Sequence, residues 1–289
     1  MEKFEQAVRG WQWKALRYFE STGSTNDEAG RWLAEGAPHL AVVVANHQTM
    51  GRGRLKRCWY TPPDAALAFS VILKDALPET SSIQPNLARI TALGALAVCR
   101  ALEKCYQLEP EIKWPNDVLV AGKKIAGILT EAHWMGATLT GIIIGIGINI
   151  AHSSIPTNRI IAFPATCVED CLPTRSGPIS NRERAGILFT VLGELTEIQP
   201  RLYTQDFIKQ WEACLAFKNQ WVEVYTDYES HQGRLNQPSV KGKLTGISPA
   251  GELCLRTKDG ALIKLETGDI HLRASPALRR GRKRKLTGE

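Results

Sequence analysis

The chain has 289 residues, of which 44% are hydrophobic and 22% are charged, an ordinary composition for one large globular domain or two unequal ones. Its net charge of +7 is concentrated at the C-terminus, because residues 279–289 hold six cationic side chains and the rest of the chain is close to neutral. No apolar run is long enough to span a membrane, and residues 1–19 lack the apolar core of a secretory signal. The seven cysteines are odd in number and irregularly spaced, so we expect reduced thiols and a cytoplasmic location.

The N-terminal half of the chain alternates helix-like and strand-like segments. Thr25 and Glu28 fit the capping box of a first helix, which Gly36 can end. Apolar residues at helical spacing predict a second helix from Pro85 to Cys105, with proline in its first turn. Residues 121–124 are expected to turn between two antiparallel strands. Apolar and β-branched runs predict strands at 40–45, 66–73, 112–114, 118–120, 125–130 and 138–150.

The sequence pattern of the C-terminal half changes from irregular and helical segments to short strands. Residues 152–180 are rich in Pro, Ser and Thr and predict irregular structure, whereas 181–198 and 204–215 predict helices. From Trp221 onward, short strands alternate with glycine-containing turns, which is the pattern of a small β-barrel. These strands are expected at 222–225, 242–244, 253–255 and 262–265. We therefore expect a first domain of residues 1–219, a small domain of residues 220–273 and a disordered basic tail of residues 274–289.

The most informative segment is the loop Gly51–Trp59, which holds two glycines and four cationic side chains in nine residues. Glycine lets the backbone approach a ligand closely, and arginine presents a planar fork of donors to phosphate or carboxylate. The loop lies between two predicted core strands, a usual place for binding residues. It therefore predicts an anion site, although a solvated basic loop is the alternative for any short run of charges.

Four more motifs accompany this loop. They are Ser24-Thr25-Asn26; Lys113-Trp114-Pro115-Asn116-Asp117; Lys124-Ile125-Ala126-Gly127-Ile128-Leu129; and a glycine-rich apolar run at Gly145-Ile146-Gly147-Ile148-Asn149. The segment Gln48-Thr49-Met50 leads directly into the loop and belongs to the same motif. In this order, and together with the loop, they resemble the biotin protein ligases. The resemblance covers residues 21–150 and returns at 221–273, which is similar to the small C-terminal domain of that family.

The resemblance implies an α+β fold of the class II aminoacyl-tRNA synthetase/biotin ligase type. Its central sheet would be mixed and largely antiparallel, with flanking helices on one side and the ligand on the other, followed by a small SH3-like β-barrel. It also implies a two-step reaction, in which biotin and ATP form biotinyl-5′-AMP and biotin then passes to a lysine of a biotin carboxyl carrier domain, that of acetyl-CoA carboxylase being the natural candidate. Mg²⁺ would accompany ATP, because it is the usual partner of hard phosphate oxygens, and no protein metal site is expected.

The chemistry of the first step suits these residue types. A carboxylate is already ionised at neutral pH, so it needs fixed cationic donors more than it needs a base. The resemblance implies that Lys124, Arg52, Arg54 and Asp117 carry the reaction, with Asp117 as the partner of the acceptor lysine or, alternatively, a turn residue after proline. The implied biotin contacts are Ser24, Thr25, Asn26, Gln48, Gly51, Arg52, Gly53, Arg54, Lys124 and Gly127. The implied nucleotide contacts are Arg54, Trp59, Lys113, Asn116 and Asn149.

Several of these residues also have a structural explanation. Ser24 and Thr25 can cap a helix, Trp59 can pack in a core, and Asn149 can lie in a buried strand. Lys56 departs from the family pattern, which usually has glycine there. If that position requires a positive φ, lysine costs about 1 kcal/mol. Otherwise its charge can grip phosphate.

Two other functions are compatible with parts of the sequence. A lipoate or octanoyl ligase or transferase would share the fold, but the polar Ser24-Thr25-Asn26 set does not suit an apolar acyl chain. A nucleic-acid-binding protein could use the small barrel and the basic tail, but few aromatic residues interleave with the charges of that tail. We expect no specific DNA binding, because about twenty residues precede the first motif, too few for a DNA-reading domain. No membrane association is expected, and a homodimer is possible.

Overall fold

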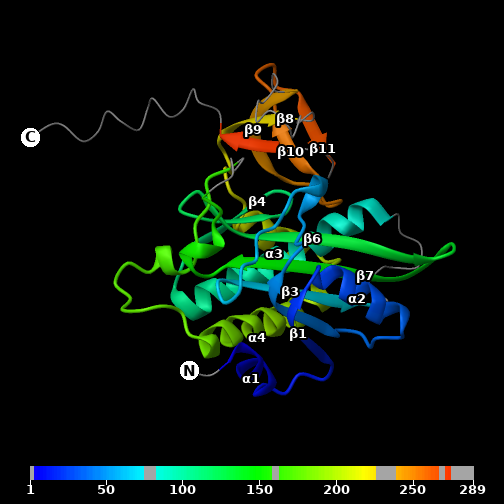
Figure 1. Ribbon diagram of the computed structural model, residues 1–289. Helices are drawn as coiled ribbons and strands as arrows, with labels where there is room; N and C mark the ends of the chain where they lie inside the picture. The colour runs from blue at the N-terminus through cyan, green and yellow to red at the C-terminus, as the bar shows by residue number, and fades with distance from the viewer. Residues whose placement is uncertain (1–2, 75–82, 158–162, 226–238, 267–270, 275–289) are drawn as a thin grey trace, which may run out of the picture.

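The computed structural model describes residues 3–74, 83–157, 163–225, 239–266 and 271–274. A seven-stranded sheet forms the larger part, and a five-stranded antiparallel sheet forms the smaller C-terminal part (Figure 1). The larger sheet has the spatial order β1 (Leu16–Thr22), β2 (Val42–Gln48), β3 (Ala66–Leu73), β7 (Thr138–Asn149), β6 (Lys123–Met135), β5 (Asp117–Val120) and β4 (Pro110–Lys113). Only the β1–β2 pair is parallel in this sheet, so the prediction of a mixed, largely antiparallel sheet is confirmed.

Helices cover both faces of the larger sheet. The long helices α3 (Ile83–Tyr106) and α4 (Asn181–Ile198) pack together on one face, where Gly94 of α3 lies against Ile128 and Ile144. Helix α2 (Thr25–Ala34) lies on the other face, against Ile143 and its neighbours. The expectation of helices on one side only is therefore wrong. The parallel β1–β2 pair requires a crossover connection, and α2 is that crossover.

The start of α2 differs in detail from its prediction. Ser24, not Thr25, is the N-cap residue, and the Glu28 carboxylate accepts a hydrogen bond from Thr22 Oγ1 at 2.7 Å. The predicted capping box is therefore wrong. Gly36 does end the helix, in the left-handed conformation with φ of 91°. The short helix α1 (Phe4–Arg9) and strand β1 were not predicted.

The predicted turn at 121–124 is present, with Ala121 and Gly122 both at positive φ between β5 and β6. The described residues of the segment 152–180, which are 152–157 and 163–180, are irregular apart from two 3₁₀ turns, η2 (His152–Ser154) and η3 (Glu169–Cys171), as expected. The loop after β2 contains a further 3₁₀ turn, η1 (Arg54–Lys56), and η4 (Gln199–Arg201) follows α4. Helix α5 (Gln205–Ala213) then leads to the small sheet.

The small sheet has the order β11 (Leu262–Leu265), β10 (Leu253–Arg256), β9 (Val240–Ile247), β8 (Trp221–Tyr225) and β12 (His271–Ala274). Four of these strands match the predicted ones, and β12 was not predicted. The small sheet touches the larger part through Trp114, whose Nε1 donates to the carbonyl of Gly251 at 3.2 Å. The domain boundary at Asn219 stays a prediction, and residues 275–289 of the basic tail lie outside the described residues.

Across the described ranges, none of the helices has both the length and the apolar character needed to cross a membrane.

Candidate active site

Most of the candidate residues gather on the α2 face of the larger sheet, beside β6 and β7, and Arg54 and Asn116 also reach a cavity walled by α3. Two glycines of β7 make this arrangement possible. A Cβ at Gly145 would collide with the Asn26 side chain, and a Cβ at Gly147 would collide with the indole of Trp59. The glycine-rich run therefore clears the surface on which α2 and the loop after β2 rest.

The first group of polar residues is buried at the start of α2. Gln48 Oε1 accepts from the Thr25 main-chain N–H at 2.8 Å and from Thr25 Oγ1 at 3.2 Å, while Gln48 Nε2 donates to Thr61 Oγ1 at 3.1 Å. Gln48 thus satisfies an N–H that the first turn of a helix leaves unpaired. Ser24 lies beside this group and is only 3% exposed.

Ser70 joins this group from the adjacent strand. Its hydroxyl lies 2.6 Å from Asn26 Oδ1 and 2.8 Å from Thr25 Oγ1, and it is fully buried. Sequence reasoning missed Ser70, although it is the only hydroxyl in the apolar run 66–73 and a buried polar group needs a partner. Thr61 was missed as well.

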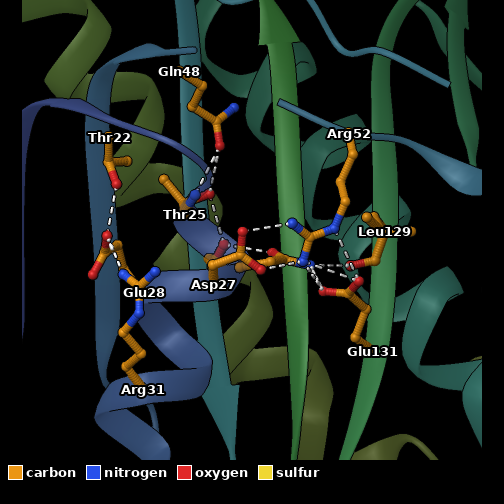
Figure 2. A network of polar contacts seen from close by, with 11 residues as sticks. Thr22, Thr25, Asp27, Glu28, Arg31, Gln48, Arg52, Leu129 and Glu131 are labelled. Atoms are coloured by element: carbon orange, nitrogen blue, oxygen red, sulfur yellow. Dashed lines mark hydrogen bonds and ion pairs between the residues drawn. The ribbon is translucent and has the colours of Figure 1, made fainter. Parts of the chain in front are cut away.

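Arg52 lies between two carboxylates that the sequence did not single out (Figure 2). Its Nη1 and Nη2 atoms donate to the two oxygens of Asp27 at 2.7 and 2.6 Å. Its Nε and Nη2 atoms donate to Glu131 at 3.3 and 3.2 Å. The Arg52 hydrogen bond is the main reason that the pKa of Asp27 lies below its usual value. Asn26 Nδ2 donates to the same Glu131 at 2.6 Å.

The loop 51–59 folds back on itself. The Trp59 N–H donates to the Gly51 carbonyl at 2.8 Å, and the Gly53 N–H donates to the Arg57 carbonyl at 2.7 Å. The residue with a left-handed backbone at the tip is Leu55, with φ of 59°, and not Lys56. The left-handed residue of the tight Arg54–Arg57 turn therefore lies one position before Lys56.

Lys124 and Lys113 form a second group around Asp117. Lys124 Nζ lies 2.6 Å from one Asp117 oxygen, and Lys113 Nζ lies 3.4 Å from the other. Burial alone would raise the pKa of Asp117, but the charges of the two lysines outweigh it and lower that pKa to about 2. The three side chains carry a net charge of +1.

Trp59 connects the two groups. Its ring centroid is 5.4 Å from Lys124 Nζ, and its indole lies over Gly147 and beside Gly127. The indole Nε1 is buried and has no hydrogen-bond partner within the described part of the chain. An orphaned donor in this position is the kind of group that a ligand can satisfy.

Arg54 and Asn116 lie at the border of the site. Arg54 Nη1 donates to Asn116 Oδ1 at 3.2 Å, and Asn116 Nδ2 donates to the Ile128 carbonyl at 3.1 Å. Both residues line a cavity of about 160 Å³. Its other walls are Leu87, Ala88, Thr91, Pro115, Ile128 and Thr130.

Asn149 has a structural contact: its Nδ2 donates to the Thr166 carbonyl at 3.0 Å. Thr166 N–H in turn donates to the Lys124 carbonyl at 2.9 Å, and the Val168 N–H donates to the Asn149 carbonyl at 3.0 Å. The segment 163–168 is thereby fastened beside both β6 and β7. Every residue expected in the site is thus among the described residues, and these contacts connect most of them.

Comparisons with known proteins agree with the sequence pattern. The model described as "Biotin/lipoate A/B protein ligase family" matches residues 18–149, and the model described as "Biotin protein ligase C terminal domain" matches residues 232–273. The biotin–[acetyl-CoA-carboxylase] ligase of Paracoccus denitrificans is 38% identical over 255 residues, which cover 83% of this chain and 93% of the relative. The bifunctional ligase/repressor BirA of Bacillus subtilis is 30% identical over 257 residues, which cover 89% of this chain and 74% of the relative.

Solved structures show the same architecture. The biotin protein ligase from Aquifex aeolicus in complex with biotin and ATP is similar with a TM-score of 0.72 and 26% identity, over 91% of this chain and 100% of that one. The biotin protein ligase from Leishmania major in complex with biotinyl-5-AMP is similar in fold, with a TM-score of 0.59 and 21% identity over 88% of this chain and 99% of that one.

Proposed function

Because this chain belongs to the biotin protein ligase family, we propose that it joins biotin to ATP as biotinyl-5′-AMP and transfers the biotin to a lysine of an acceptor protein. The observation that carries this proposal is the group of Lys124, Lys113 and Asp117. Its net positive charge lies beside the indole of Trp59 and the arginine-rich loop, where two anionic reactants can meet. The names of the matched relatives favour a carrier domain of acetyl-CoA carboxylase as the acceptor.

We assign the head of biotin to the buried polar group at the start of α2. A ureido ring is neutral and offers both donors and acceptors, and these hydroxyl and amide side chains match it. A lipoyl or octanoyl chain offers these polar side chains no group with which to exchange hydrogen bonds, so its burial against them is unfavourable. The proposed biotin contacts are Ser24, Thr25, Asn26, Gln48, Gly51, Arg52, Gly53, Arg54, Lys124 and Gly127.

The adenylate is assigned to the other side of Trp59. Lys124 would place its charge at the carboxylate and α-phosphate, where it reduces the repulsion between two anions. Arg54, Trp59, Lys113, Asn116 and Asn149 are the proposed nucleotide contacts. No group of three or more His, Cys, Asp or Glu side chains that could hold a metal occurs in the described ranges. We therefore propose that Mg²⁺ arrives bound to the phosphates of ATP.

Asp117 has a positioning role in this proposal. With a pKa of about 2, it is a weak base for a lysine ammonium, whose ordinary pKa is about 10.4. Its two lysine contacts instead suit it to hold Lys124 and Lys113 in place while the acceptor amine attacks. The choice between monomer and homodimer stays open, and the expectations of no specific DNA binding and of a cytoplasmic location stay predictions.

The test is a reaction of the purified chain with biotin, ATP, Mg²⁺ and a carrier domain. Pyrophosphate release should require both biotin and ATP, and mass spectrometry should find one biotinyl group on one lysine of the carrier. Lipoate in place of biotin should give no product. Pyrophosphate release without biotin, or an equal reaction with lipoate, would overturn the proposal.

A further inference from the structure

Both edges of the Arg52 guanidinium that could bind a ligand carboxylate through two hydrogen bonds already bind carboxylates of the protein. One edge binds Asp27 through two hydrogen bonds of 2.6 and 2.7 Å, and the neighbouring edge binds Glu131 through Nε and Nη2 (Figure 2). Four of the donor positions of the side chain are therefore directed at protein carboxylates. An arginine that clamps a ligand carboxylate needs one of these edges for the ligand.

The local charge also argues against a direct clamp. Asp27 and Glu131 together carry two negative charges against the single positive charge of Arg52, so this group has a net charge of −1. An approaching carboxylate would meet more negative than positive charge there. The net positive charge of the site lies instead at Lys124 and Lys113.

The two carboxylates belong to rigid elements. Asp27 is in the first turn of α2, and Glu131 lies in β6, whose neighbour β7 passes beneath the helix. Arg52 comes from the loop, so its side chain fastens the loop to a helix and a strand at once (Figure 2). A bidentate arginine–carboxylate contact fixes orientation as well as distance.

Glu131 has a second contact that matters for biotin. Its Oε2 accepts from Asn26 Nδ2 at 2.6 Å, which leaves Asn26 Oδ1 toward Ser70. One carboxylate therefore orients both the loop arginine and an amide assigned to the biotin head. The position of the loop and the geometry of the biotin contacts are physically connected through this side chain.

We propose that Asp27 and Glu131 are positioning residues which, through Arg52, hold the segment 51–54 over the site and, through Asn26, align the biotin contacts. In this arrangement the backbone of the loop faces the ligand, and the Arg52 side chain serves as its fastening. This inference rests on the proposed function. It differs from that proposal in the role of Arg52, which would otherwise bind the reactants directly.

If Arg52 holds the loop, Asp27→Asn and Arg52→Gln should have similar effects. If Arg52 binds the reactants directly, Arg52→Gln should be much more damaging than Asp27→Asn. If Arg52 fastens the loop, then Asp27→Asn and Arg52→Gln remove the same contact. Both should raise KM for biotin by about tenfold with kcat for biotin-dependent pyrophosphate release within about threefold of wild type. The double variant should be no worse than Arg52→Gln alone, because the two changes act through one contact. Glu131→Gln should also raise KM.

Hydrogen exchange of residues 50–54 supplies a measurement that does not depend on activity. Asp27→Asn and Arg52→Gln should both speed exchange in the unliganded chain, and Asp27→Glu, which keeps the charge, should partly restore protection. The matched control is Glu28→Gln, since Glu28 lies in the same turn but contacts Thr22 and Arg31. It should leave KM and exchange as in wild type.

The inference is overturned if Asp27→Asn leaves both KM and exchange unchanged, or if Arg52→Gln lowers kcat a hundredfold while Asp27→Asn does not. The first result would mean that other contacts hold the loop. The second would make Arg52 a direct ligand of the reactants. A wild-type chain without ligase activity would instead contradict the proposed function. The exchange measurement would still decide whether Asp27 holds the loop.

Discussion

Asp117 and Lys124 form a close ion pair, with 2.6 Å between Oδ1 and Nζ, across the antiparallel strands β5 and β6. Lys113 contacts the other oxygen of the same carboxylate. The pair explains why one aspartate can lie among candidate anion-binding residues without weakening the site, since it serves two lysines and leaves one positive charge in excess.

The Asp117 pair predicts a defined pH dependence of stability. The pKa of this carboxyl falls from 3.8 to about 2 on folding, so it stabilises the folded chain fully above pH about 4 and loses that contribution as the pH falls toward 2. The contribution is about 2 kcal/mol, given 1.36 kcal/mol for each pKa unit. Urea unfolding at pH 6 and pH 3 should therefore show a smaller pH effect in Asp117→Asn than in wild type.

The control for this experiment is Asp170→Asn, which changes an exposed carboxylate that lies 3.2 Å from His152 Nδ1 and contacts neither lysine. Its pH effect should match that of wild type. An unchanged pH effect in Asp117→Asn would show that the two lysines do not stabilise the ionised carboxylate.

Replacement of Lys124 should separate chemistry from folding. We expect Lys124→Ala to lower kcat for biotin-dependent pyrophosphate release by ~10²–10³, the usual effect of losing one fixed charge at a reacting centre. Lys113 still pairs with Asp117 in that variant, so the chain should fold. Lys123→Ala, which changes the exposed neighbour, should keep wild-type kcat. Equal losses of kcat in the two variants would contradict the assignment of Lys124 to the reacting carboxylate and α-phosphate.

Ser70 should matter for biotin affinity although it lies within an apolar strand. Ser70→Ala removes the hydrogen bonds to Asn26 and Thr25, and each unsatisfied buried acceptor costs about 1–2 kcal/mol. We expect KM for biotin to rise by ~5–30-fold, as read from steady-state pyrophosphate release. Thr196→Ala on α4, which removes a hydroxyl bonded to the Leu192 carbonyl, should leave KM unchanged. A wild-type KM in Ser70→Ala would mean that the Asn26 amide is held without it.

The close contact of Gly147 with Trp59 gives a prediction about packing. Gly147→Ala forces the indole away, and overpacking of this kind lowers the free energy of unfolding by about 1–3 kcal/mol. Gly186→Ala is the matched control, because that helical glycine has open space where a Cβ would lie, and alanine in place of glycine stabilises a helix by about 0.5–1 kcal/mol. Urea unfolding should show opposite signs for the two variants. If the free energy of unfolding of Gly147→Ala equals that of wild type, the Trp59 indole does not pack against Gly147.

Much of the fold could be predicted from local signals. Helix α4 begins and ends where its pattern predicts, and its N-cap Ser180 forms a capping box with Glu183. The turn at Ala121 and Gly122 is equally local. Helix α1 and strand β1 were missed because α1 has six residues and β1 has no clear alternation of buried and exposed positions. Their structure depends on neighbours that are distant in sequence.

The site divides in the same way. Motif residues such as Lys124 and Asp117 could be named in advance, because they stand in recognisable segments. Asp27 and Glu131 could not, since their importance comes from meeting Arg52 across the sheet and helix. The family pattern raised the question of a positive φ at Lys56, but the residue with a positive φ is its neighbour Leu55.

The contact of the Trp114 indole with Gly251 ties the small sheet to the segment that supplies Lys113, Asn116 and Asp117. Trp114 is fully buried, so loss of the Gly251 carbonyl would leave its N–H without an acceptor inside the protein. A lesion in the C-terminal sheet can therefore weaken adenylate formation at a distance, by loosening the support under the lysines and not by removing any group that meets the reactants.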